Sequence, residues 1–126
     1  MRAVDTNVLV RLLTRDDAGQ SDRAQRWITA GAWVSILALA ETAWVLSSVY
    51  GRSPGQIASL IEILLNHEDL TLQDSDVVVA ALKCFRKRPA LGFSDCLLLE
   101  LARKAGHLPL GTFDRELSKV DGAEKL

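Results

Sequence analysis

The chain has 126 residues, of which 48% are hydrophobic and 25% are charged, and its formal net charge at pH 7 is −1. This length suits a single core, so we expect residues 1–126 to form one domain. The nearly balanced charge argues against a uniformly basic surface for nucleic acid, although it leaves room for local basic patches. No apolar run is long enough to span a bilayer and no signal-peptide pattern is present, so we expect a cytoplasmic protein with no membrane partner.

The two cysteines and two histidines make a metal site of nitrogen and sulfur ligands improbable. Cys84 and Cys96 both lie in helix-like apolar stretches, which favours two buried thiols over a disulfide or a zinc site. His67 and His107 are the only histidines.

Strand-like and helix-like segments alternate along the chain. In chain order we expect a strand at residues 2–4 (RAV), helices over 7–13 and 21–31, a strand at 32–34 (AWV), and helices over 37–50 and 53–66. Then follow a strand at 70–72 (LTL), helices over 74–88 and 94–106, a strand at 108–113 (LPLGTF) and a weak strand near residue 126. Ser53 and Pro54 suit an N-cap and the first helical position, and Gly31, Gly51, Pro89 and Gly106 suit helix ends.

Strands separated by helices indicate parallel pairing through right-handed crossovers. We therefore predict a three-layer α/β/α domain around a central, mainly parallel sheet. Functional sites in such folds lie at the carboxyl ends of the strands. Asp5 directly follows the first expected strand.

Four acids merit individual attention. Asp5, Asp95 and Asp114 each stand at the start of an expected helix, so each has a plain alternative role as an N-cap or a first-turn charge. Glu41 is the only charged residue between Arg26 and Arg52, and its helical neighbours are apolar. We expect Glu41 to be buried and to need a proton, a cationic side chain or a metal ion.

Together, the four acids can converge at one pole of the sheet. Four carboxylates in close proximity repel one another unless some are protonated or a cation is present. A set of oxygen ligands suits Mg²⁺ or Mn²⁺. Such ions support hydrolysis of phosphodiester bonds, which is therefore the chemistry we expect.

Four stretches resemble, in order and spacing, the PIN-domain proteins and among them the small VapC-type toxins of toxin–antitoxin pairs. They are VDTNVLVRLL, LALAETAWVL, GFSDCLLLELARKAG and LGTFDREL. The resemblance implies an acidic metal site of Asp5, Glu41, Asp95 and Asp114, surrounded by Thr6, Asn7, Ser94 and Thr112. It also implies an endoribonuclease that cuts structured RNA and is restrained by a cognate antitoxin.

Candidate contacts with RNA and protein follow from basic and apolar residues. Arg11 and Arg15, one turn apart on the first helix, are best placed to reach a phosphate, whereas the basic ends of later helices also have a stabilising role there. Trp27, Trp33 and Trp44, with the apolar helices, predict a homodimer or an antitoxin-binding groove, unless all three tryptophans belong to the core.

Three other functions remain as alternatives. A phosphotransferase of the haloacid dehalogenase type needs a second carboxylate at position 7, where this chain has Asn. A receiver domain needs adjacent acids after the first strand and an Asp after the third; Asp74 fits the latter, although we assign Asp74 and Asp76 to capping. A non-catalytic scaffold would not need the four acids.

Overall fold

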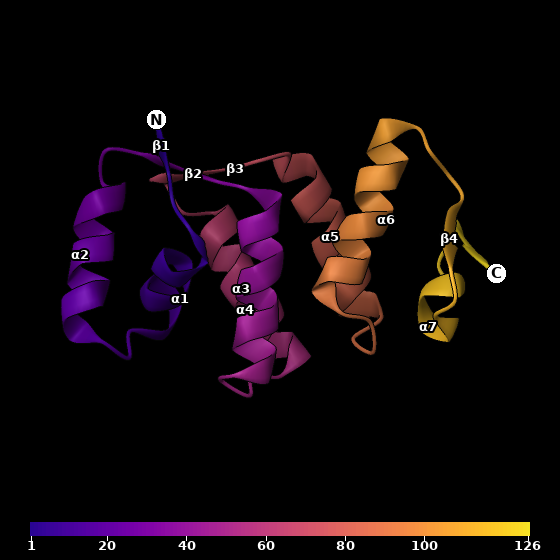
Figure 1. Cartoon of the computed structure of the whole chain (residues 1–126), viewed down its shortest axis with the longest axis horizontal. Coiled ribbons are helices and arrows are strands. Elements are labelled where there is room, and N and C mark those ends of the chain that lie inside the picture. Colours follow the sequence, from indigo (N-terminus) through magenta and orange to yellow (C-terminus); the bar gives the residue numbers. More distant parts are fainter. The chain divides into compact units, whose positions relative to one another are not determined.

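The computed structural model describes all residues from Met1 to Leu126 and divides into two compact units. Unit 1 comprises Met1–Ser75 and unit 2 comprises Asp76–Leu126. Figure 1 shows the elements of each, from indigo at the N-terminus to yellow at the C-terminus. No helix combines the length and apolar character needed to cross a bilayer.

Unit 1 contains a three-stranded parallel sheet and four helices. Its elements are β1 (Arg2–Ala3), α1 (Thr6–Thr14), α2 (Ala18–Ile28), β2 (Ala32–Val34), α3 (Ile36–Ser48), α4 (Pro54–Leu65) and β3 (Leu70–Leu72). The strand order is β1-β2-β3, with Arg2 beside Ala32 and Ala32 beside Leu70. Each pair of strands is joined by two helices, as parallel pairing requires.

Local sequence explains the helix boundaries of unit 1. Asp5, Asp17 and Ser35 precede α1, α2 and α3 with extended backbone, and each accepts a hydrogen bond from a first-turn N–H. Ser53 and Gln56 form a complete capping box at the start of α4, and Pro54 takes its first position. The prediction of this cap is confirmed. Helix α2 starts three residues before the expected position because Asp17 supplies an earlier cap.

The core of unit 1 is built from one face of each helix and from alternate strand residues. Helix α1 contacts α2 and α3, and α3 contacts α4. In β2, Ala32 and Val34 are buried while Trp33 between them is partly exposed. The largest side chains with almost no exposure in this unit are Leu9, Ile28, Leu39, Leu46, Ile61 and Leu64. Removal of this apolar area from water is the main stabilising contribution.

Unit 2 contains a helical pair followed by a small parallel sheet. Its elements are α5 (Ser75–Lys87), which begins at the unit boundary, α6 (Phe93–Ala105), β4 (Leu110–Thr112), α7 (Arg115–Ser118) and β5 (Ala123–Lys125). The rings of Phe85 and Phe93 meet edge to face, with centroids 5.8 Å apart. Strands β4 and β5 pair in parallel, with Leu110 beside Ala123.

Both cysteines are free thiols, as predicted. Cys84 is half-buried and Cys96 is buried. Burial raises the pKa of the Cys96 thiol far above its usual range, and the neighbouring Cys84 adds to the rise. The Cys96 thiol therefore stays protonated and behaves as a small apolar group.

Every strand pairing in the chain is parallel, so the α/β class predicted from the alternation of elements is confirmed. The strands at 32–34 and 70–72 have the predicted bounds, and the weak strand near the C-terminus is present. The strand expected over 108–113 is shorter, at Leu110–Thr112. The structure places β1, β2 and β3 in one sheet and β4 and β5 in another.

Candidate functional site

Asp5 lies at the carboxyl end of β1 and caps α1. Its backbone is extended (φ −95°, ψ 179°), and its Oδ1 accepts a hydrogen bond of 3.2 Å from the backbone N–H of Val8. Asp5 is therefore the N-cap of α1, and this hydrogen bond holds its carboxylate at the strand end. Because a carboxylate has further lone pairs, this role leaves Asp5 able to accept another partner.

Glu41 lies close to the same strand end. Its Oε2 accepts a hydrogen bond of 2.7 Å from the hydroxyl of Thr6, the residue that follows Asp5. The bond connects positions 35 residues apart in sequence, and it joins the start of α1 to α3. Asp5, Thr6 and Glu41 thus form one group in unit 1, which we call the β1 junction.

The expectation that Glu41 is buried was wrong. Its side chain is exposed, and the flanking apolar residues Leu37 and Trp44 are 69% and 67% exposed. The apolar face of α3 that enters the core is instead the one bearing Ala38, Leu39, Ala43 and Leu46. Helix α3 is apolar on nearly all sides, so its sequence did not reveal which face is covered.

Gln73 was not singled out from the sequence, yet it connects the ends of two strands with α3. Its backbone N–H donates to the carbonyl of Val34 over 2.8 Å, and its side-chain Oε1 accepts from the N–H of Ile36 over 2.9 Å. Gln73 therefore fixes the first turn of α3, the helix that carries Glu41. The available signal was a polar residue directly after the strand LTL.

Asp95 and Asp114 occupy helix starts in unit 2. Asp95 stands in the first turn of α6 and accepts a hydrogen bond of 3.4 Å from the backbone N–H of Gly92. Asp114 is the N-cap of α7, and its Oδ1 accepts from the N–H of Leu117 over 2.9 Å. The hydroxyl of Thr112 accepts from the backbone N–H of Asp114 over 3.0 Å. Thr112 therefore orients the chain at Asp114.

The remaining predicted site residues lie beside these acids in sequence. Asn7 is exposed in the first turn of α1, and Ser94 is exposed in the first turn of α6. Each unit thus carries two of the four acids, Asp5 and Glu41 in unit 1 and Asp95 and Asp114 in unit 2. The structure shows no group of three or more His, Cys, Asp or Glu side chains that could hold a metal ion. Convergence of all four acids remains a prediction.

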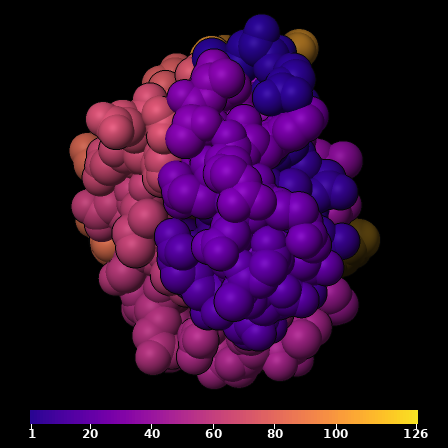
Figure 2. All heavy atoms as spheres, turned by 90° about the vertical axis from the view of Figure 1, so that its left-hand side faces the viewer, coloured from indigo at the N-terminus to yellow at the C-terminus, as the bar shows by residue number.

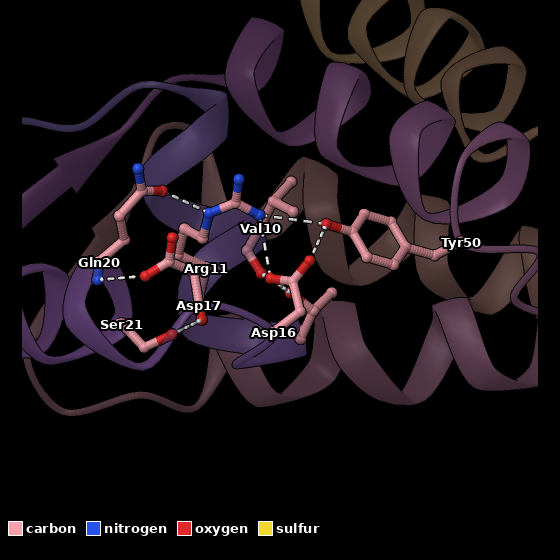
Figure 3. Close-up of polar contacts among 8 residues, drawn as sticks. Val10, Arg11, Asp16, Asp17, Gln20, Ser21 and Tyr50 are labelled. Carbon is pink, nitrogen blue, oxygen red and sulfur yellow. Dashed lines mark hydrogen bonds and ion pairs between the residues drawn. The ribbon is translucent and has the colours of Figure 1, made fainter.

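Arg11 is the centre of a polar network in unit 1 (Figure 3). Its Nη1 contacts Asp16 Oδ1 at 3.0 Å and the hydroxyl of Tyr50 at 3.1 Å, and its Nε donates to the side-chain oxygen of Gln20. The Tyr50 hydroxyl also donates to Asp16 over 2.7 Å. The Tyr50 hydrogen bond and the Asp16 charge raise the pKa of Arg11 above its ordinary value. Arg11 therefore already has partners within the chain, and its contact with RNA remains a prediction.

Arg15 is the C-cap of α1 and has a left-handed backbone (φ 52°). Its guanidinium makes only a long hydrogen bond of 3.4 Å to Gln25. The side chain is exposed. The contact of Arg15 with RNA remains a prediction.

Asp74 directly precedes α5, and its predicted capping role, like that of Asp76, remains a prediction. Asp74 has a left-handed backbone (φ 46°), unlike the extended backbone of the N-caps of α1 and α2. Asp76 lies in the first turn of α5 and pairs with Lys104 at 3.1 Å. This hydrogen bond lowers the pKa of Asp76.

All three tryptophans are partly or largely exposed, at 43% for Trp27, 37% for Trp33 and 67% for Trp44. The alternative that all of them belong to the core is therefore wrong for this chain. Exposed aromatic rings are typical of binding surfaces for proteins or nucleic acids.

The chain matches the family model of the PIN domain over residues 2–123. No curated protein matches it at a significant level. Among solved structures it is similar to VapC20 of Mycobacterium tuberculosis, described as a toxin that cleaves the sarcin–ricin loop. That likeness has 20% sequence identity and a TM-score of 0.45, and it covers 98% of each chain.

Proposed function

This chain belongs to the PIN-domain family, and on that premise we propose that it is a metal-dependent endoribonuclease and the toxin of a toxin–antitoxin pair. Its two units would form one catalytic domain that hydrolyses phosphodiester bonds of structured RNA. The observation that carries the proposal is the β1 junction, where Thr6 links the Asp5 position to Glu41 through a 2.7 Å hydrogen bond.

Asp5, Glu41, Asp95 and Asp114 would hold one or two Mg²⁺ or Mn²⁺ ions. The donor set fits, because the polar side-chain atoms of the β1 junction are all oxygens and hard divalent cations prefer oxygen ligands. When bound, such an ion stabilises the negative charge that develops on the attacking and leaving oxygens of a phosphodiester. Association of the two pairs of acids without a cation would be opposed by their like charges.

The polar neighbours of the acids would position them. The Val8 N–H fixes one oxygen of Asp5, and the Thr6 hydroxyl fixes one oxygen of Glu41. In unit 2 the Leu117 N–H fixes Asp114, and Thr112 holds the preceding backbone. Preorganised donors of this kind raise catalytic efficiency because little rearrangement is needed during reaction. Asn7 and Ser94 would complete the surroundings of the same site.

The proposed partners are RNA, a cognate antitoxin and a second copy of the chain, in the cytoplasm. Arg11 and Arg15 on α1 would contribute positive charge toward the RNA backbone. The exposed rings of Trp33 and Trp44 and the exposed Leu37 supply apolar surface for a protein partner. An antitoxin segment that brings a basic side chain to the acids would compete with the metal for them.

Cleavage of a structured RNA by purified protein tests the proposal. We expect cleavage in Mg²⁺ or Mn²⁺, loss of cleavage after addition of EDTA, and recovery when the metal is restored. Asp5→Asn and Asp114→Asn should each abolish cleavage, whereas Asp76→Asn, a change of the same kind outside the site, should not. Cleavage that persists in EDTA would contradict a metal-dependent mechanism. Absence of cleavage by the folded wild type in either metal would favour the non-catalytic scaffold.

A further inference from the structure

A pocket of about 340 Å³ lies between α1 and α2 in unit 1. Its lining includes Asn7, Arg11, Gln20, Arg23 and Trp27. Figure 2 is viewed from the side on which α2 lies in Figure 1, and purple and indigo spheres of the N-terminal part of the chain make up much of the surface seen there. The volume is in the range of about 300–1,000 Å³ that small-ligand sites occupy.

The charge of the pocket is positive, although the chain as a whole has a net charge of −1. Its lining contains two arginines and neither Asp nor Glu. The charge of Arg11 is balanced by Asp16 at 3.0 Å, which leaves Arg23 as the cation available to a ligand. Arg23 is exposed on α2. A ligand with a negative group would therefore be favoured here.

Trp27 adds a flat aromatic surface one helical turn after Arg23. Its indole is 43% exposed, and the guanidinium of Arg2 already lies over the ring, 3.4 Å from the centroid. Arg2 therefore covers one face of the indole, and a planar group would stack on the part of the ring that remains exposed. Stacking of a nucleobase on an aromatic side chain contributes about 1–3 kcal/mol in single-stranded complexes.

Hydrogen-bonding groups complete the lining. The side-chain oxygen of Gln20 accepts from Arg11, so its amide N–H groups remain as donors, and Asn7 supplies a second amide. Amides can bond to base edges or to a ribose 2′-hydroxyl. A cation, a flat ring and amides together match a nucleotide better than an acidic peptide, because such a peptide can bond to the amides but offers no planar base to the ring.

The pocket adjoins the β1 junction through α1. Asn7 and Val8 line the pocket, and the N–H of Val8 bonds to Asp5 over 3.2 Å. The pocket and the Asp5 carboxylate therefore share the first turn of one helix, which rises about 5.4 Å per turn. An RNA chain whose phosphodiester lies at Asp5 would reach the pocket with a neighbouring nucleotide.

We propose that this pocket binds an unstacked nucleotide next to the scissile bond, with its base on Trp27 and its phosphate on Arg23. The inference rests on the proposed ribonuclease function and adds a specificity site to it. Recognition of an unstacked nucleotide suits RNA loops, where bases are free to leave the stack.

Binding can be measured separately from cleavage. The probe is a fluorescein-labelled single-stranded RNA decamer of mixed sequence, titrated with protein in EDTA and followed by fluorescence anisotropy at fixed salt. Arg23→Gln and Trp27→Ala should each raise the Kd about tenfold, because each removes one of the two principal contacts. Trp27→Phe keeps a stacking ring and should restore most of the affinity. Arg26→Gln, an equal charge change on α2 outside the pocket, should have little effect.

Cleavage kinetics provide a second measurement. In Mg²⁺, Arg23→Gln should raise KM for RNA while kcat changes little, since the pocket does not touch the reacting atoms. A Kd unchanged in both Arg23→Gln and Trp27→Ala would overturn the inference, as would an equal loss in Arg26→Gln. Unchanged RNA binding with weaker inhibition by the antitoxin would assign the pocket to the antitoxin instead. Because the Kd is measured in EDTA, it tests the pocket even if the proposed nuclease activity fails.

Discussion

The Thr6 hydroxyl donates a 2.7 Å hydrogen bond to Oε2 of Glu41, and this bond joins the first turn of α1 to α3. Asp5, immediately before Thr6, is held by the hydrogen bond that its side chain accepts from the backbone N–H of Val8. Two acids far apart in sequence are thereby placed at the carboxyl end of β1, which is where α/β folds carry their sites.

Thr6→Val should lower RNA cleavage about tenfold, because Glu41 loses the group that orients it, and groups of this kind contribute 10- to 100-fold. Its cost in the free energy of unfolding should be about 1 kcal/mol or less, since the bond is exposed. Thr6→Ser should restore cleavage. Steady-state kinetics and thermal melts measure the two effects separately, and full activity of Thr6→Val would show that the bond has no role in positioning.

Tyr50→Phe should lower the melting temperature at neutral pH, with a smaller difference in acid. The hydrogen bond from Tyr50, followed by that from Thr14, lowers the pKa of Asp16 from its ordinary value of 3.8. A lowered folded-state pKa stabilises the fold above the unfolded-state pKa, and this contribution disappears as pH falls through the folded-state value. Melts from pH 7 downward test this. Ser48→Ala, whose hydroxyl bonds only to the Trp44 carbonyl, should show no such pH dependence.

Arg15→Gly should increase the free energy of unfolding by about 0.5–1 kcal/mol, because glycine adopts the left-handed backbone of this C-cap without a steric cost. Arg15→Ala lacks this advantage and serves as the matched control in urea unfolding. If Arg15 also contacts phosphate, both variants should weaken RNA binding to the same extent. A glycine variant less stable than the alanine variant would contradict the assignment of the cap.

Ser53→Ala should cost about 1 kcal/mol, because it removes the acceptor of the capping box at α4. Ser53→Asp retains an acceptor and should be close to wild type. Ser59→Ala, an exposed change inside the same helix, should be neutral or slightly stabilising. The free energy of unfolding of the three variants is measured in denaturant. Equal stability of Ser53→Ala and the wild type would contradict a stabilising role for the Ser53 cap.

The sequence predicted those features that depend on local chemistry. The strand at 32–34, the cap at Ser53 and Asp5 at a strand end each follow from a few adjacent residues and are present in the structure. These features have short-range causes, such as capping hydrogen bonds and the alternation of side chains in a strand.

Features that depend on packing were predicted less well. Helix α3 is apolar around most of its circumference, so the exposure of Glu41 and Trp44 could not be read from its pattern. The role of Gln73 depends on contacts with two other elements. The partners of Arg11 likewise include Tyr50, 39 residues away, which no local pattern reveals.

Binding of Mn²⁺ to single-site variants tests most directly whether acids of both units form one site. Titration calorimetry should detect Mn²⁺ binding to the wild type and a large loss of affinity in both Asp5→Asn, from unit 1, and Asp95→Asn, from unit 2. Asp76→Asn should bind as the wild type does. Equal loss in the first two variants is the result that our account predicts, and undiminished Mn²⁺ binding by folded Asp95→Asn would contradict it.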